Sequence, residues 1–251
     1  MTGLKAKGQP RSTGSSSKRK VKKKRPSTPK HIEAWIIIDE IGEVGKKPKR
    51  IKGKIYEPTK TYGFGFSIIK NPDKFSKVRE NFDYKNPDTA GKGTRKLKDH
   101  KKIELAHDIR ISGAKTHGTS FDKMNRPPKG WSQIGKDVQI GMLQKTIDHA
   151  LSKTKCSKVT IVVEDHNSYH ENGINVAESM SEYYGKKYRK NVTMITAKKS
   201  DKVYSKHLAA NDAVAHATFL KEERKEPKMS YAMGQKVKKY DRRDSIIRKR
   251  V

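Results

Sequence analysis

The sequence has few of the features that mark secreted, membrane or zinc-binding proteins. Its single cysteine, Cys156, excludes an intramolecular disulfide and any zinc site built from several thiolates, and this usage is typical of a reducing cytosol. The longest purely apolar run, residues 34–38, is far shorter than the roughly 20 residues that a membrane-spanning helix needs. Leu4 and Val21 are isolated among basic and polar residues, so a secretory signal is not indicated. We therefore expect a cytoplasmic protein that does not enter a membrane.

Acidic residues are scarce relative to basic ones. The 251 residues include 59 Lys and Arg against 27 Asp and Glu, which gives a formal net charge of +32. A field of this strength attracts polyanions, so nucleic acid, either RNA or DNA, is the expected partner, and an acidic membrane surface is the weaker alternative. Hydrophobic residues make up only 32% of the chain, which predicts that part of it does not fold.

The basic residues are concentrated at the two ends of the chain. Residues 1–30 contain no acid and few apolar groups, and we interpret them as a disordered basic arm. Residues 222–251, interrupted by Pro227 and Gly234, are predicted to be a second basic tail. Residues 31–221 remain, which is enough for one domain. The arm contains a basic cluster that is predicted to bind nucleic-acid phosphates and that equally resembles a nuclear-targeting signal. The alternative is that the arm only keeps the chain soluble. The cluster consists of Lys18, Arg19, Lys20, Lys22, Lys23, Lys24 and Arg25.

Hydrophobic patterning between the two ends predicts a mixed α/β domain. Apolar, β-branched runs predict strands, and apolar residues at three- and four-residue steps predict helices. The predicted strands are residues 31–39, 62–69, 114–121, 159–163 and 192–196. The predicted helices are residues 134–151, 174–184 and 208–220. Residues 81–102 are polar and contain Pro87, so they are predicted to form an exposed basic loop, either a clamp on nucleic acid or a surface insertion.

Acidic residues follow two predicted strands and lie on the last predicted helix. Asp39 and Glu40 end the first strand, Glu164 and Asp165 end the fourth, and Asp212 lies on the helix. If these carboxylates meet at one edge of the sheet, they repel one another and need cations, such as two Mg²⁺ or Mn²⁺ ions, to stay together. Two such ions activate water for attack on a phosphodiester. The alternative is that these acids are solvated caps of ordinary strands.

Three blocks that contain these acids resemble the signature motifs of the domain-of-unknown-function 3800 family. They are residues 36–42 (IIIDEIG), 162–165 (VVED) and 208–215 (LAANDAVA). Their order and spacing match the family over residues 33–220. Because this family is thought to have an RNase H-like fold, the resemblance implies an RNase H-like mixed sheet flanked by helices.

The resemblance also implies roles for individual residues of a metal-dependent nuclease. Asp39 would bridge two metal ions, and the catalytic residues Asp165 (with Glu164 as the alternative) and Asp212 would each complete one ion's site. In this mechanism a metal-bound hydroxide attacks phosphorus, and nearby cations neutralise the charge that develops. The candidate cations are Lys123 and Lys206, which are also predicted to contact the nucleic acid.

Two functions remain open at this point. The first is a nucleic-acid-binding protein that cleaves its substrate with divalent metal ions. The second is a non-catalytic, RNA-binding structural protein, such as a ribosome-associated one, that uses a nuclease-like scaffold. The three acidic blocks favour the first function. Ile41 and Ala209 stand where the family usually has Ser and Gln, and Asn211 precedes the last Asp, and these departures favour the second.

Other polar and aromatic groups have two interpretations each. The histidines and Glu171 within residues 166–171 are either metal ligands or part of a polar loop. His216, four residues after Asp212, is either a proton carrier or half of an ordinary helical pair. The alternating aromatic residues of 62–66 either stack on unpaired bases or face the core beneath a helix.

Overall fold

The first predicted strand is the centre of the sheet. β1 runs from Glu33 to Gly42, and Ile36, Ile37 and Ile38 within it are completely buried, as expected of a strand covered on both faces. β1 pairs antiparallel with β4 (Thr61–Ile69) and parallel with β6 (Lys158–Glu164), so it has a neighbour on each side. The structure is a computed structural model that describes residues 33–43, 45, 49–51, 54–131 and 135–248.

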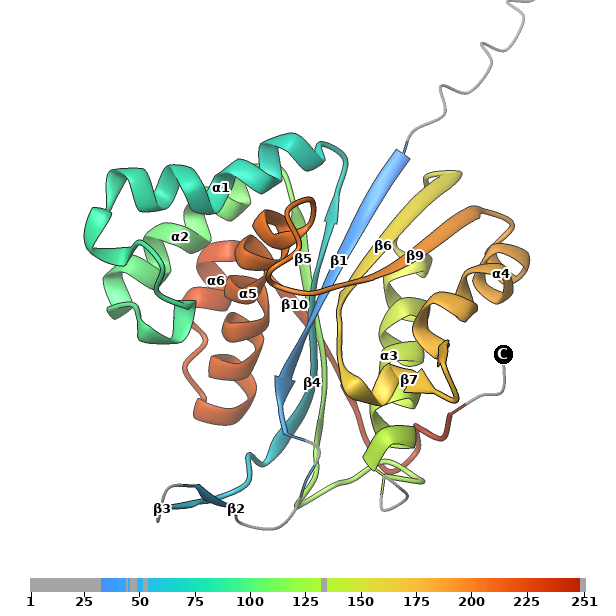
Figure 1. Cartoon of the computed structure of the whole chain (residues 1–251). Coiled ribbons are helices and arrows are strands. Elements are labelled where there is room, and N and C mark those ends of the chain that lie inside the picture. Colours follow the sequence, from blue (N-terminus) through green and yellow to red (C-terminus); the bar gives the residue numbers. More distant parts are fainter. Residues whose placement is uncertain (1–32, 44, 46–48, 52–53, 132–134, 249–251) are drawn as a thin grey trace, which may run out of the picture. The chain divides into compact units, whose positions relative to one another are not determined.

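One mixed sheet contains β1, β4, β6 and three further strands, which are β5 (Lys115–Asp122), β9 (Asn191–Ala197) and β10 (Lys236–Tyr240). Its strand order is β10-β5-β4-β1-β6-β9 (Figure 1). β1, β4 and β5 are successive antiparallel strands, whereas β6 and β9 run parallel to β1. Three antiparallel strands followed by two parallel ones form an RNase H-like sheet. The predicted fold class and all five predicted strands are therefore confirmed.

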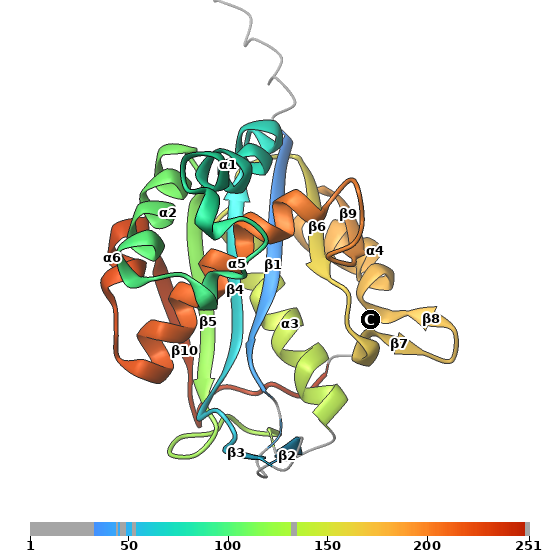
Figure 2. The same cartoon turned by 60° about the vertical axis from the view of Figure 1, so that its left-hand side comes forward.

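Helices cover both faces of the sheet (Figure 2). The α-helices of the described residues are α1 (Pro72–Lys85), α2 (Asp99–Ile111), α3 (Gly135–Ser152), α4 (Val176–Tyr188), α5 (Ser205–Phe219) and α6 (Lys228–Met233). α3 and α4 cover one face, with Ile36 and Ile38 in the core beneath them. α5 packs across β1, β4 and β5 on the other face, where α1, α2 and α6 surround it and Ile37 is buried. The three predicted helices correspond to α3, α4 and α5.

Short elements connect the main ones. They include two hairpins, β2 (Lys49–Ile51) with β3 (Lys54–Tyr56) and β7 (His170–Glu171) with β8 (Ile174–Asn175), and four short helices, η1 (Pro87–Thr89), η2 (Thr94–Lys96), η3 (Asn167–Tyr169) and η4 (Leu220–Arg224). No helix in the described part of the chain has the length and apolar character to cross a membrane. These connections matter because several of them border the candidate site.

The aromatic residues of β4 belong to the core. Tyr62, Phe64 and Phe66 are completely buried and pack in the cluster of side chains beneath α3. The ring of Tyr62 meets Phe64 and Phe121 edge to face, with centroids 5.9 and 5.7 Å apart. The core interpretation of this stripe is confirmed, and these rings are not available to stack on bases.

The prediction of an exposed loop over residues 81–102 is wrong at both of its ends. α1 begins after Asn71, whose side chain accepts a hydrogen bond from the Lys74 backbone, and it continues to Lys85. Its buried residues Phe75, Val78 and Phe82 recur at helical spacing, but charged residues between them hide the pattern. α2 already begins at Asp99, so only residues 86–98 connect the two helices.

The prediction of a basic tail over residues 222–251 is wrong for residues 222–248. This segment contains α6 and then β10, which pairs in parallel with β5 at the edge of the sheet. Tyr240 is buried and its hydroxyl donates to the Lys145 carbonyl, and Ile246 is completely buried in the main core cluster. Lys236, Lys238 and Lys239 are exposed, as is common on an edge strand. The folded unit therefore extends past residue 221, while the predicted arm, residues 1–30, lies outside the described residues.

Candidate active site

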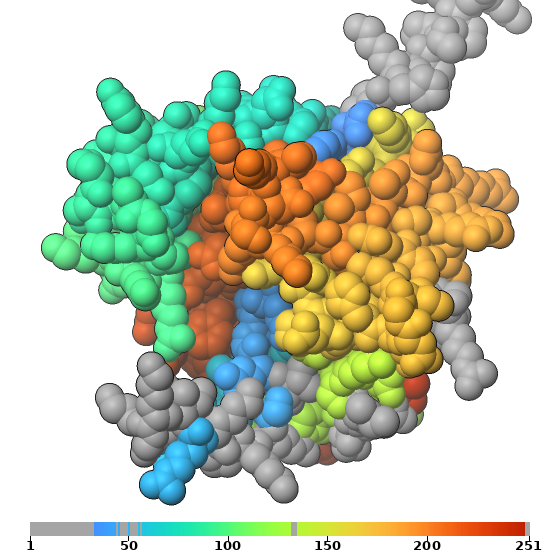
Figure 3. All heavy atoms as spheres, in the orientation of Figure 1, coloured from blue at the N-terminus to red at the C-terminus, as the bar shows by residue number. Residues whose placement is uncertain are grey.

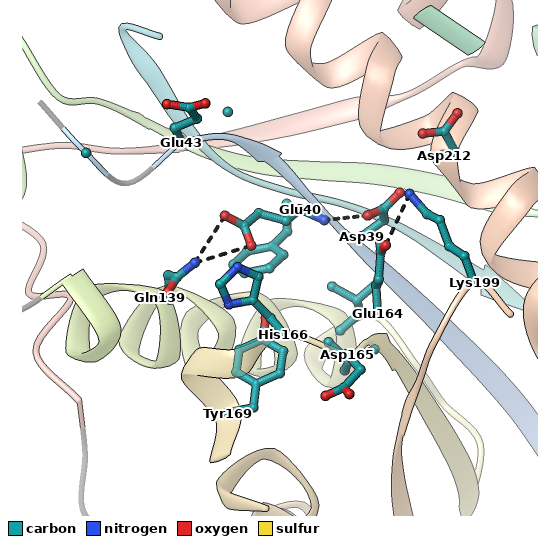
Figure 4. Close-up of a pocket in the computed structure, with 15 residues that line it drawn as sticks. Asp39, Glu40, Glu43, Gln139, Glu164, Asp165, His166, Tyr169, Lys199 and Asp212 are labelled. Carbon is teal, nitrogen blue, oxygen red and sulfur yellow. Dashed lines mark hydrogen bonds and ion pairs between the residues drawn. The ribbon is translucent and has the colours of Figure 1, made fainter. Parts of the chain in front are cut away.

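Asp39 and Glu164 face each other on neighbouring strands. The register pairs Ile38 of β1 with Val163 of β6, so the residues that follow project from the same face of the sheet. Asp39 is only 4% exposed, and the Glu164 carboxyl hydrogen-bonds to it. Lys199, which follows β9, extends into the same space and forms an ion pair with Glu164, with 3.1 Å between Nζ and Oε1 (Figure 4). Two carboxyl groups and one ammonium group thus meet where three parallel strands end.

The charged side chains of this cluster shift one another's pKa values. Burial, then the hydrogen bond and the negative charge of Glu164, raise the pKa of Asp39 well above its ordinary value. Burial lowers the pKa of Lys199, but the charges of Asp39 and Glu164 outweigh it and raise that pKa above the ordinary value. The site therefore has an excess of negative charge that favours a bound proton or a cation.

Asp212 adds a third carboxylate from the opposite wall. It lies on α5, borders the same cavity as Asp39, and contributes to the raised pKa of Asp39 through its negative charge. One of its oxygens, Oδ2, accepts a hydrogen bond from the backbone N–H of Thr94, with a distance of 3.0 Å. The neighbouring Asn211 is completely buried and binds β4, accepting from the Ser67 hydroxyl at 2.7 Å and donating to the Gly65 carbonyl at 3.2 Å. Asn211 thus fixes α5 on the sheet at the level of the site.

Asp165 does not join this group. Its carboxylate points away from Asp39 and Glu164 and lies 2.8 Å from Nε2 of His170 (Figure 4). The sequence favours Asp165 over Glu164 as the catalytic residue, whereas the geometry puts Glu164 beside Asp39. His166 interacts with Ser168 in the adjacent turn. These contacts are those of a polar loop.

The three carboxylates surround an open cavity of about 460 Å³. In Figure 3 it is a hollow in which the blue end of β1 lies between α5 and the yellow residues that follow β6. Carboxylate oxygens are the ligands that Mg²⁺ and Mn²⁺ prefer, so the donors are of the right chemical type. Among the described residues, however, no group of three or more His, Cys, Asp or Glu is close enough to hold a metal ion. In this arrangement Lys199 supplies the positive charge beside Glu164.

Glu40 points to the other side of the sheet. It lies under α3, with Gln139 Nε2 at 3.4 and 3.5 Å from its two carboxylate oxygens. Burial, opposed by the hydrogen bond from Gln139 and assisted by the charges of Glu164 and Glu43, raises the pKa of Glu40 to about 7. Glu40 therefore borders the cavity without joining Asp39, because successive side chains of a strand alternate between its faces.

Replacing Glu40 with Gln is expected to remove a pH dependence of stability. Because the folded-state pKa, about 7, lies above the ordinary value of 4.5, the native state binds the proton more tightly than the unfolded state. In the wild type, the stabilisation that the raised pKa of Glu40 provides is complete below pH 4.5 and is lost as the pH rises through 7. The whole change in the free energy of unfolding is at most about 3 kcal/mol. Urea unfolding at several pH values checks this, with Glu57→Gln as the control for loss of one exposed carboxylate. A wild-type minus E40Q difference that does not change between pH 4.5 and 8 contradicts it.

Lys123 is a buried residue that positions the loop after β1. It is 1% exposed, and its ammonium donates to the backbone carbonyls of Glu43 and Gly45. The prediction that Lys123 contacts nucleic acid is therefore wrong for this structure, because the ammonium is enclosed by these carbonyls. Since Glu43 and Gly45 border the cavity, Lys123 shapes one side of the site.

Replacing Lys123 with Met is expected to lower the free energy of unfolding by about 1–3 kcal/mol, because the two carbonyls lose their charged donor. Lys206→Met is the matched control. Lys206 is an exposed residue that forms an ion pair with Glu80 of α1 at 2.7 Å, and surface pairs of this kind contribute less than about 1 kcal/mol. Chemical denaturation of both variants compares the two effects. Equal stability of K123M and K206M would show that the Lys123 contacts have no structural role.

The cation at the carboxylates is neither of the two predicted lysines. Lys206 lies at the start of α5, does not border the cavity of the carboxylates, and is paired with Glu80. Lys199 takes that place. The signal in the sequence was available, because residues 198–199 follow a strand parallel to β1 and β6 and must lie at the same sheet edge. The predicted phosphate-binding cluster of residues 18–25 lies outside the described residues.

His216 is not poised to carry protons at neutral pH. Burial and the positive charge of Lys102 lower the pKa of His216 to about 4, although Asp212 acts in the opposite direction. The imidazole is therefore neutral over the physiological range. Its ring stacks against Phe219, with centroids 6.3 Å apart and an interplanar angle of 17°. His216 and Phe219 therefore form a pair of uncharged, stacked rings on α5.

Comparisons with known proteins add little beyond the fold. No protein-family model matches the chain, and no curated protein matches it. The chain is similar to a solved structure of the PCNA:RNase HII complex from Archaeoglobus fulgidus, with 14% sequence identity and a TM-score of 0.46. The match covers 79% of this chain and 78% of that chain. The RNase H-like fold is therefore assigned from the order and directions of the strands in the sheet.

Proposed function

We propose that this protein binds nucleic acid and cleaves it with the help of divalent metal ions bound at Asp39, Glu164 and Asp212. The observation that carries the proposal is the burial of Asp39. A carboxyl group that is 4% exposed and lies beside a second carboxyl destabilises the folded state. Apart from Glu164, its hydrogen-bond partner within the described residues is the backbone N–H of Glu40, the next residue of its own strand. Carboxyl groups with shifted pKa values that line an open cavity are typical of catalytic sites.

The chain's own residues support this chemistry in distinct ways. Asp39, Glu164 and Asp212 carry the oxygen ligands that Mg²⁺ or Mn²⁺ prefers, although in this structure they are not close enough together to hold an ion. Such an ion would supply positive charge for a phosphate group. Lys199 offers a second positive charge beside Glu164. Gln139 and Tyr169 form the opposite wall of the cavity. The net charge of +32 favours a polyanionic substrate. A two-ion site, and membership of the domain-of-unknown-function 3800 family, remain predictions.

A second candidate is a non-catalytic nucleic-acid-binding protein, such as a ribosome-associated one, in which the acidic cluster is residual. The observation that favours it is the ion pair between Lys199 and Glu164, because an ammonium already neutralises this carboxylate. Basic extensions bind RNA or DNA equally well in either case, so binding does not separate the two functions. Cleavage and metal binding do.

The deciding experiment uses the full chain, because a fragment of residues 31–221 would lack β10 and expose the edge of β5. Mg²⁺ and Mn²⁺ are titrated into the protein by calorimetry, and cleavage of single- and double-stranded RNA and DNA is assayed with each metal and with EDTA. We expect metal binding and metal-dependent cleavage together. Tight nucleic-acid binding without either one would favour the non-catalytic function.

A further inference from the structure

A second hollow is continuous with the carboxylate cavity. Its volume is about 600 Å³, and Glu40, Gly42, Glu43 and Asp212 border both spaces. In Figure 3 the hollow extends from β1 over α5 toward the green residues that precede α2. Its walls come from five segments, which are the end of β1 with the residue after it, the stretch before β4, η2, α5 and η4. A substrate at the carboxylates therefore has a groove leading away from them on this side.

Three cations from three segments line this groove. They are Lys60, Arg95 and Arg224, all of which are exposed. Within the part of the chain that the structure describes, none of the three forms an ion pair. Of the acids at this end, Glu223 is bound to the wall, since its two oxygens accept the backbone N–H groups of Lys60 at 2.9 Å and Thr61 at 2.7 Å. Glu43 and Glu57 are the exposed acids that line the groove.

Arg95 is held at a fixed place relative to the carboxylates. The preceding residue, Thr94, is completely buried, and its backbone N–H donates to Asp212. Leu97 on the other side of Arg95 is 5% exposed and packs in the core around α5. An arginine between two anchored neighbours presents its planar guanidinium from a defined position, and this geometry suits two hydrogen bonds to one phosphate.

Two aromatic rings also line the groove. His216 and Phe219 stack on each other and are both partly exposed in the groove. Aromatic rings beside cations are the usual combination in proteins that bind single strands, because every base has a face that can stack. The phosphate-binding and base-binding groups thus lie in one groove that starts at Asp212.

We propose that this groove binds a single strand of nucleic acid next to the carboxylates, with Arg95, Lys60 and Arg224 contacting phosphates and the His216–Phe219 pair contacting a base. This inference rests on the proposed function, since it makes the groove the path of the strand that is cleaved. It also identifies residues of the loop between α1 and α2 as part of the binding surface, in addition to the arm predicted over residues 1–30.

The test compares Arg95→Ala with Lys96→Ala in the full chain. Both residues are exposed, adjacent in η2 and positively charged, but Lys96 does not line the groove. We expect R95A to weaken the affinity for labelled single-stranded RNA or DNA at least about tenfold, measured in EDTA, and K96A by less than about threefold. R95A should also reduce the slope of log affinity against log salt by about 0.7, which corresponds to one phosphate contact on a single strand. RNA, DNA and duplex probes separate the possible substrates.

Photo-crosslinking gives an independent readout that the basic ends cannot mask. Single strands that carry 5-iodouracil are expected to crosslink to the peptide that contains His216 and Phe219, and Phe219→Leu should reduce that crosslink.

Equal loss of affinity in R95A and K96A, or crosslinks confined to residues outside the groove, would overturn the inference. If R95A alone weakens binding but no metal supports cleavage, the groove stands and the nuclease function fails. If Asp39→Asn abolishes cleavage while R95A changes neither affinity nor KM, the nuclease function stands and the groove proposal fails.

Discussion

Replacing Asp39 with Asn is expected to lower the rate of nucleic-acid cleavage by at least about three orders of magnitude. Asp39 is the most enclosed carboxyl of the cavity and lies between Glu164 and Asp212, so any ion or phosphate held by these groups depends on its charge. Binding of an uncleaved strand should not weaken, because Asn removes negative charge from a site that faces a polyanion. Gel assays of cleavage and fluorescence anisotropy in EDTA measure the two effects separately.

Two substitutions control for the position of the charge. Glu164→Gln should behave like D39N, because Glu164 lies directly beside Asp39 and pairs with Lys199. Asp165→Asn should lower the rate less than about tenfold, because that carboxylate points toward His170 instead. A large loss in D165N with little loss in E164Q would reverse this assignment.

The stability of D39N separates lost chemistry from lost folding. The pKa of Asp39 is raised in the folded state, so its contribution to stability is present at low pH and declines as the pH rises through that pKa. D39N has no such group and should therefore gain stability relative to the wild type as the pH increases. A folded, equally or more stable D39N that still cleaves at the wild-type rate would remove Asp39 from the mechanism.

Replacing Gly65 with Ala is expected to lower the free energy of unfolding by at least about 3 kcal/mol and the melting temperature by roughly 6 °C or more. Gly65 lies opposite Asp39 in the register of β1 and β4. A Cβ atom at this position would lie 2.4 Å from Cα and 2.5 Å from the backbone N of Ala215 in α5. Because the obstacle is backbone, no side-chain rotation relieves it, and α5 must move away from the sheet.

The same displacement would move Asp212 away from Asp39, so G65A should lose cleavage as well as stability. Gly93→Ala is the matched control. Gly93 has φ −60°, which alanine adopts freely, and its added Cβ would meet nothing within 4 Å. Calorimetry should give a change of less than about 1 kcal/mol for G93A. If G65A melts at the wild-type temperature, the close approach of α5 to β4 does not hold the site together.

The strands and helices that build the sheet were predictable because their signal is local. Residues 36–38 are apolar on both faces, and α3 repeats apolar residues at helical spacing over five turns of chain. The resemblance then implied the RNase H-like order that the structure has. β10, α1 and α2 were not found, because lysines and acids outnumber their few buried residues and average hydrophobicity falls below that of a typical element.

The sequence by itself indicated which acids can meet, because Asp39 and Glu164 close the apolar runs of two predicted strands. In the structure these strands are parallel, and their pairing ends at Ile38 and Val163, directly before the two acids. Only the tertiary structure decided which of them do. Glu164 rather than Asp165 lies beside Asp39, Lys199 rather than Lys123 or Lys206 supplies the nearby charge, and Glu40 faces the opposite layer. The physical reason is that side-chain direction alternates residue by residue along a strand. The face that each residue occupies is set by the register between strands and by the helices packed on them, which segments distant in the sequence determine together.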